Sequence, residues 1–265
     1  MSTHVVIPDT QVTPSVRRDH LTWIGRYIAD LRPDVVVHLG DHWDFESLSV
    51  YDRGKLQFEG RRLRADIDAG NAGLAELTAP IYDVQETARR GNRRIWRPRL
   101  VMLRGNHEHR LSRAVEEDPK LEGFLDYSQL NDTSLGWEVH DFLDPVEIDG
   151  VVYAHYFYNP LTGKPWGGTV ATMLKNIGHT FTMGHRQTFD VSVRYVGNRQ
   201  IRGIVAGACY LHDEDYKGPQ GNHHWRGILV KHEVRDGQYD LMEVSLDYLC
   251  RKYEGMSLVD YLEEM

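Results

Sequence analysis

The chain has 265 residues, of which 41% are hydrophobic and 26% charged, and its formal net charge is −8. This balance argues against a disordered chain, and no apolar run approaches the roughly 20 residues that span a bilayer. The N-terminus lacks a basic stretch followed by an apolar one, so a signal peptide is not expected. The only cysteines, Cys209 and Cys250, lie far apart, which favours reduced thiols in a cytoplasmic protein.

The first half of the chain has the pattern of a layered α/β fold. Thr3–Ile7 and Val35–Leu39 are continuous apolar runs, which are typical of strands buried on both faces. Between them, apolar positions at helical spacing from Val16 to Leu31 predict a helix that Pro33 ends. A third strand is expected at Leu100–Leu103, after a mainly helical segment.

That helical segment concentrates positive charge. From Arg53 to Arg104 there are 12 Lys/Arg against 6 Asp/Glu. We interpret residues 45–99 as a basic insertion, with a helix from about Glu59 to Arg90. A basic segment in an acidic chain favours an anionic partner such as nucleic acid, and the alternative is a solvated helix face.

The second half of the chain is rich in hairpin signals, in which short apolar runs flank Gly-containing turns such as Asp149-Gly150. Strands are expected at residues 146–148, 151–155, 180–183, 189–196, 201–206, 228–234 and 239–244. A short helix is expected at 168–175 and a closing helix within 245–265, over Asp247–Glu264. No linker or repeat separates the two halves, so residues 1–265 are expected to form one domain.

Side chains that bind metal ions follow five of the expected strands at the point where each strand ends. These are Asp9 and Gln11, Asp41 and Asp44, Asn106 and His107, His155, and His185 and Gln187. Ligands of layered α/β folds lie beyond the carboxyl ends of the strands, so these loops are expected to share one site. Carboxylates, amide oxygens and imidazoles together suit divalent first-row metal ions, and one shared Asp can hold two ions close together.

These blocks resemble the calcineurin-like metallophosphoesterases, whose pattern is D-x-H, G-D-x-x-D, G-N-H-E/D, a lone H and G-H-x-H. The chain carries the corresponding blocks in the same order: Asp9-Thr10-Gln11, Gly40-Asp41-His42-Trp43-Asp44, Gly105-Asn106-His107-Glu108, His155 and Gly184-His185-Arg186-Gln187. The resemblance implies a four-layer αββα sandwich with mixed sheets and active-site loops at the strand ends. It also implies a hydrolase of phosphate esters with two metal ions.

Residue by residue, the resemblance implies two metal positions bridged by Asp41. Asn106, His155 and His185 complete the second position, and Asp9, Gln11 and Gln187 complete the first. The family has histidine where this chain has the two glutamines. An amide oxygen is a harder and weaker ligand than imidazole, which favours Mn²⁺, with Mg²⁺ as the alternative, over Zn²⁺ or Fe. Either glutamine could instead hydrogen-bond a water.

The glutamine pattern is similar to that of bacteriophage-type members of the family. It therefore implies a viral or prophage source and action in the host cytoplasm.

For catalysis the resemblance implies that His107 protonates the leaving oxygen and that Asp44 orients its imidazole and raises its pKa. Arg104 and Arg186 are candidates for bidentate binding of a phosphate oxygen, and salt bridging is the alternative for both.

Further residues could contribute to the site or have a purely structural role. His42 and His109 could replace missing ligands or line the rim of the site. His223-His224-Trp225 lies in a loop at 218–227 that could line the cleft or lie on the surface. The aromatic residues that could stack on a base, or pack in the core or rim, are Tyr156, Tyr158 and Trp166.

The leading hypothesis is hydrolysis of phosphodiester bonds in nucleic acid or nucleotides, which the basic segment and the aromatic residues favour. The run Leu103-Arg104-Gly105-Asn106-His107-Glu108 also matches Ser/Thr-type protein phosphatases, so that activity, or general phosphomonoesterase activity, is the alternative. A non-catalytic binding module with a degenerate metal site is the alternative from another class. No membrane partner is expected.

Overall fold

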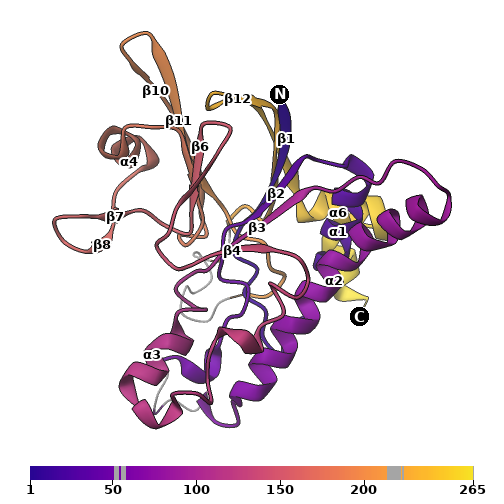
Figure 1. The fold of residues 1–265 in the computed structure, drawn as a ribbon, viewed down its shortest axis with the longest axis vertical. Coiled ribbons are helices and arrows are strands. Elements are labelled where there is room, and N and C mark those ends of the chain that lie inside the picture. Colours follow the sequence, from indigo (N-terminus) through magenta and orange to yellow (C-terminus); the bar gives the residue numbers. More distant parts are fainter. Residues whose placement is uncertain (51–53, 55–57, 214–221, 223, 265) are drawn as a thin grey trace.

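Two β-sheets face each other in this computed structural model, which describes residues 1–50, 54, 58–213, 222 and 224–264 (Figure 1). The first sheet has six strands in the order β13-β12-β1-β2-β3-β4. Their bounds are Gln238–Ser245, Gly227–Arg235, Ser2–Ile7, Val35–His38, Arg99–Leu103 and Glu138–His140. Strands β1 to β4 run parallel, whereas β12 is antiparallel to both of its neighbours, so the sheet is mixed.

The second sheet has five strands in the order β10-β11-β9-β6-β5. Their bounds are Phe189–Val196, Arg199–Ala206, Phe181–Met183, Val151–Ala154 and Val146–Ile148. Helix α4 (Val170–Ile177) packs on the outer face of this sheet. It begins at Thr169, whose hydroxyl caps the amide of Thr172, and ends at Gly178 in the left-handed conformation.

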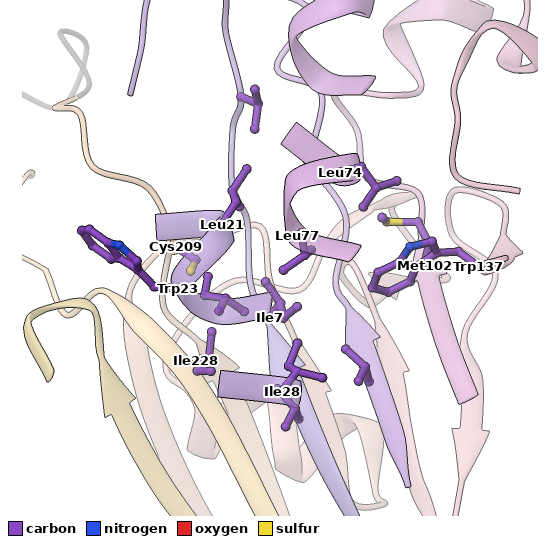
Figure 2. Packing of buried hydrophobic residues seen from close by; sticks show 14 of the residues in the cluster. Ile7, Leu21, Trp23, Ile28, Leu74, Leu77, Met102, Trp137, Cys209 and Ile228 are labelled. Carbon is purple, nitrogen blue, oxygen red and sulfur yellow. The ribbon is translucent and has the colours of Figure 1, made fainter. Parts of the chain in front are cut away.

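Four helices cover the outer face of the first sheet within the described part of the chain. They are α1 (Asp19–Leu31), α2 (Leu63–Arg90), α6 (Leu246–Glu254) and α7 (Leu258–Glu263). Figure 2 shows Ile7, Met102 and Ile228 of the sheet in one cluster with helix residues such as Leu21 and Leu77. Strand alternation explains this packing, because neighbouring side chains of a strand point to opposite faces.

Among the described residues, three separate apolar cores therefore define four layers. Val5 packs among the helices of the outer face, and Val6, next along the strand, packs between the two sheets against residues such as Tyr153. The third core joins α4 to the second sheet through residues such as Met173 and Phe181. The expected αββα sandwich is confirmed.

Several smaller elements lie at the end of the sandwich where the parallel strands finish. They are α3 (Arg110–Glu117), the 3₁₀ turns Glu46–Leu48, Pro119–Leu121 and Tyr127–Gln129, and the two-stranded ribbon β7 (Tyr158–Asn159) and β8 (Lys164–Pro165). The sequence pattern predicted neither α3 nor β4, because neither has a distinct apolar run.

The closing helix predicted over Asp247–Glu264 is wrong in one respect, because the structure has two helices there. Gly255 adopts the left-handed conformation after α6, and Ser257 then caps α7 by accepting the amide of Asp260. The basic segment does contain one long helix, α2, which packs on α1 and is tied to it by an ion pair between Arg18 and Glu76 at 2.9 Å. The division of residues 1–265 into one domain with an insertion stays a prediction. Among the described residues, no helix combines the length and apolarity needed to cross a membrane.

Candidate metal centre

The loops at the ends of β1, β2, β3, β6 and β9 meet at one edge of the sandwich, as the sequence predicts. Asp41, His155 and His185, from three of these loops, each bring one ligand atom within 4.8 Å of the others. His155 Nε2 lies 3.3 Å from Asp41 Oδ2 and 2.9 Å from Asn106 Oδ1. The other ring nitrogen of His155 contacts the carbonyl of Leu39 at 2.8 Å, which aims Nε2 into the site. The structure thus brings together the four residues proposed for the second metal position.

The three residues proposed for the first metal position lie beside them. Asp9 Oδ2 and Gln11 Oε1 are buried and have no hydrogen-bond partner among the described residues. Gln187 Oε1 accepts a hydrogen bond from the Tyr210 hydroxyl at 3.0 Å. Buried oxygens without partners are costly unless something absent from the protein chain satisfies them, so Asp9 and Gln11 fit a cation.

Four of the proposed ligands have strained backbones. Gln11, Asp41, His185 and Gln187 have φ values of 39°, 50°, 67° and 59°, in the left-handed region that residues other than glycine avoid. Each such residue costs of order 1–3 kcal/mol and persists only where its surroundings enforce it. Their coincidence at one site indicates that the loops are shaped to aim side chains.

The charges of the site are strongly coupled. Burial alone would raise the pKa of Asp41, but His107 and His155 hold it below its ordinary value. Burial lowers the pKa of His155, but the Asp41 carboxylate outweighs it and raises that pKa to about 9. Burial and the neighbouring Asp41 raise the pKa of Asp9 to about 7. A divalent cation would favour the deprotonated form of each of these groups, so metal binding is expected to release protons.

The proposed catalytic pair is assembled. His107 Nδ1 contacts Asp44 Oδ1, and His107 Nε2 lies 3.8 Å from Asp41 Oδ2, so the imidazole borders the metal centre. Burial lowers the pKa of His107, but Asp41 and Asp44 raise it above its ordinary value overall. Arg110, which the sequence did not single out, donates a hydrogen bond to His107 Nε2 at 3.1 Å.

Glu108 has a role that the sequence reasoning missed. Its buried carboxylate accepts four backbone N–H groups: those of Asp41 (3.0 Å), His42 (2.6 Å), Trp43 (3.0 Å) and Gly105 (2.7 Å). It therefore ties the loop after β2 to the loop after β3. Its place in the Asn-His-Glu run was the signal, but neighbours along the chain do not reveal a backbone partner 65 residues away.

The two arginines differ. Arg104 pairs with Asp132 at 3.3 Å and Asp141 at 2.9 Å and lies over the Tyr127 ring, which favours the salt-bridge alternative for this residue. Arg186 is exposed and donates to the carbonyl of Gly168.

The remaining candidate residues differ in burial and in the groups that they contact. His42 is fully buried and contacts Thr10 and the carbonyl of Gly70 in helix α2, so it is not a rim residue. His109 stacks on Phe142 at 4.8 Å between ring centroids. His224 contacts Tyr210 at 3.3 Å, whereas His223 lies outside the described residues. Trp166 packs against the third core, and Tyr158 is half exposed.

Comparison with known proteins identifies the class to which this fold and site belong. Residues 3–206 match the model of the calcineurin-like phosphoesterase family. The chain therefore belongs to that family, whose members are metal-dependent phosphoesterases, and the resemblance seen in the motifs is confirmed.

Particular relatives come from viruses. The Gene 54 proteins of Mycobacterium phage L5 and Mycobacterium phage D29 are 34% and 32% identical to this chain over 88 residues. In each case the match covers 33% of this chain and 34% of the relative, so the chain spans about a third of the length of these curated relatives. Among solved structures, the phosphoesterase YfcE from E. coli matches with a TM-score of 0.38 and 11% identity, over 92% of this chain and 99% of YfcE.

Proposed function

We propose that the chain hydrolyses phosphodiester bonds of nucleotides or nucleic acid with the help of two divalent metal ions, Mn²⁺ being preferred. The observation that carries the proposal is the meeting of five strand-end loops around buried oxygens of Asp9 and Gln11, which have no hydrogen-bond partner among the described residues. When bound, the metal ions would draw charge from the phosphoryl oxygens and acidify the attacking water. The preference for Mn²⁺ rests on the oxygen-rich first position.

His107 is proposed to give a proton to the leaving oxygen. Its contact with Asp44 fixes the ring, and its raised pKa makes the doubly protonated imidazole available near neutral pH. Asp44 would hold Nδ1–H so that Nε2–H points to the substrate. Arg110 now contacts Nε2, and it must shift towards the substrate phosphate when the leaving oxygen takes that place.

The side chains beside the metal centre support a nucleotide substrate. The ring centroid of Tyr156 lies 4.8 Å from that of His185 and 5.4 Å from that of Phe142. Two aromatic rings that border the proposed ligands offer a surface on which a base can stack, at about 1–3 kcal/mol per base. A phosphoprotein substrate has no need of such a surface.

The basic segment supports a polynucleotide partner. Arg89 and Arg90 are paired with Glu86. Arg93 and Arg94 are exposed, and no ion pair involves them within the described part of the chain. Exposed arginines such as these would contact the phosphates of a polynucleotide, and its binding would then depend on the salt concentration.

The test is a screen of the purified protein with Mn²⁺, Mg²⁺ or Zn²⁺ on an aryl phosphodiester, an aryl phosphomonoester and single-stranded DNA. We expect Mn²⁺-dependent cleavage of the diester. His107→Ala should lower kcat about 100-fold or more, because general acid catalysis contributes 10²–10⁴-fold. His232→Ala, on strand β12 away from the site, is the matched control. Equal activity of the two variants would refute the role of His107.

The same screen distinguishes the proposed phosphodiesterase from two other functions. A phosphomonoesterase or protein phosphatase would prefer the monoester, but the pairing of Arg104 with two carboxylates disfavours that reading. A non-catalytic module would cleave nothing, and the His107–Asp44 pair has no purpose there. The phage relatives lead us to propose a phage origin and action in the host cytoplasm.

A further inference from the structure

Strand β10 forms one edge of the second sheet. It pairs with β11 on one side, and its other side has no partner strand among the described residues. Figure 1 shows the β10–β11 hairpin projecting beyond the other elements at the top of the molecule. Proteins usually protect long edge strands with charges, proline or a bulge, because an open edge can pair with another chain.

Most of the exposed side chains of this strand are apolar, and its pairing is regular. Val193, Tyr195 and Val196 are 46%, 69% and 51% exposed, and Val191 is 37% exposed. The pairing with β11 runs without a bulge from Phe189 to the Gly197-Asn198 turn. The strand has no proline and no bulge, and its charged residues are Asp190 and Arg194.

The hydrogen-bond pattern shows which residues face the open edge. Thr188 accepts a hydrogen bond from the amide of Gly207 at 3.1 Å, so the backbone groups of Thr188 point towards β11. In an antiparallel ladder these directions alternate along the strand. The N–H and C=O groups of residues 189, 191, 193 and 195 therefore point outwards, where no described strand receives them.

We propose that β10 pairs antiparallel with β10 of a second copy of this chain, about a twofold axis at Ser192. This register joins the outward-pointing backbone groups of both strands. It places Asp190 opposite the partner's Arg194, Val191 opposite the partner's Val193, and Phe189 opposite the partner's Tyr195. The two five-stranded sheets then form one continuous sheet.

The charged residues of β10 indicate both that the partner is a second copy of this chain and which register the two strands adopt. Twofold axes at the neighbouring residues 191 and 193 satisfy the same backbone groups. However, they place Asp190 opposite serine or valine, and only the axis at Ser192 pairs it with arginine. Arg194 is exposed and has no ion pair within the described part of the chain, whereas Asp190 is exposed and accepts one bond, from the amide of Val170. A strand whose charges and apolar residues complement its own reversed copy fits a second copy of itself.

The first test uses the oligomeric state of the full chain, measured by sedimentation over a range of concentrations. The wild type should be a dimer that dissociates on dilution. Val193→Pro removes an outward N–H without touching the ladder to β11, so it should give a monomer with an unchanged circular dichroism spectrum. Val193→Thr, which keeps the N–H, should remain a dimer.

The second test addresses the register. Arg194→Asp places like charges opposite each other twice per dimer and should weaken dimerisation about tenfold. Adding Asp190→Arg to that variant restores opposite charges and should restore the dimer. A monomeric wild type, a dimer that resists Val193→Pro, or a charge swap that fails to restore dimerisation would each overturn the proposal. None of these outcomes depends on the proposed enzymatic activity.

Discussion

Replacing Glu108 with glutamine should loosen the loops that carry the metal ligands. In the wild type, each carboxylate oxygen of Glu108 accepts two backbone N–H groups, from Gly105 and Asp41 on one side and from His42 and Trp43 on the other. Glutamine has the same shape but only one carbonyl oxygen. Whichever way the amide turns, its NH₂ group faces two N–H donors and leaves both without an acceptor.

The number of N–H donors left without an acceptor sets the size of the destabilisation. A buried donor left without an acceptor costs about 1–3 kcal/mol, so two of them cost about 2–6 kcal/mol. Since a domain of this kind is stable by only about 5–15 kcal/mol, the loss is a large fraction of the total. It should also raise the Mn²⁺ concentration needed for activity, because the amide of Asp41, the proposed bridging ligand, is one of the four donors.

Urea denaturation followed by tryptophan fluorescence, in buffer with EDTA, measures the effect apart from metal binding. Glu147→Gln on the exposed side of β5 is the matched control and should stay within about 0.5 kcal/mol of the wild type. A loss below about 1 kcal/mol for Glu108→Gln would mean that the four hydrogen bonds do not fasten the loops, and the reasoning would be refuted.

Three further results are expected. Gln11→His should raise Zn²⁺ affinity relative to Mn²⁺ in a calorimetric titration, since imidazole suits Zn²⁺ better, and an unchanged ratio would contradict a ligand role for Gln11. Burial lowers the pKa of Lys231 well below its ordinary value. The unfolded chain therefore binds more protons, and the unfolding free energy of the wild type should rise with pH towards 10 by up to about 1.4 kcal/mol per pH unit. Lys231→Met should lose that slope in urea titrations, and equal slopes would show that Lys231 is charged in the fold. Gly70→Ala would place a Cβ 1.9 Å from Trp43 Cδ1 and should cost about 1–3 kcal/mol in thermal denaturation, unlike Gly167→Ala, where nothing lies within 4 Å.

The layers of the fold and the edge that holds the site could be predicted from the sequence because their signals are local. An apolar run such as Val35–Val37, followed by Gly40 and Asp41, marks both a buried strand and the place where it ends. The parallel order β1-β2-β3 then brings the ends together without further information. The break after α6 was also local, since Gly255 and Ser257 are ordinary signals for the end of one helix and the start of another.

Contacts between distant segments could not be predicted in the same way. Nothing near Arg104 in the sequence indicates that Asp132 and Asp141 enclose its guanidinium, because β4 and the turns before it have no apolar periodicity that would place them. The hydrogen bond from Arg110 to His107 depends on the turn that leads into α3, which the sequence pattern did not reveal.

The site has more candidate ligand residues than side-chain oxygens that are available to a cation. Asp9 Oδ1 accepts the amide of His185 at 3.0 Å, and Asp41 Oδ1 accepts the amide of His107 at 2.9 Å. In each carboxylate, Oδ1 thus holds a strained or catalytic loop in place, and Oδ2 remains for a cation. With Glu108 wholly engaged by backbone groups, the acidic residues of the motifs supply far fewer free oxygens than their number suggests. The amide oxygen of Gln11 is buried and has no partner in the described part of the chain, so it matters more to the first metal position than its weak basicity alone would indicate.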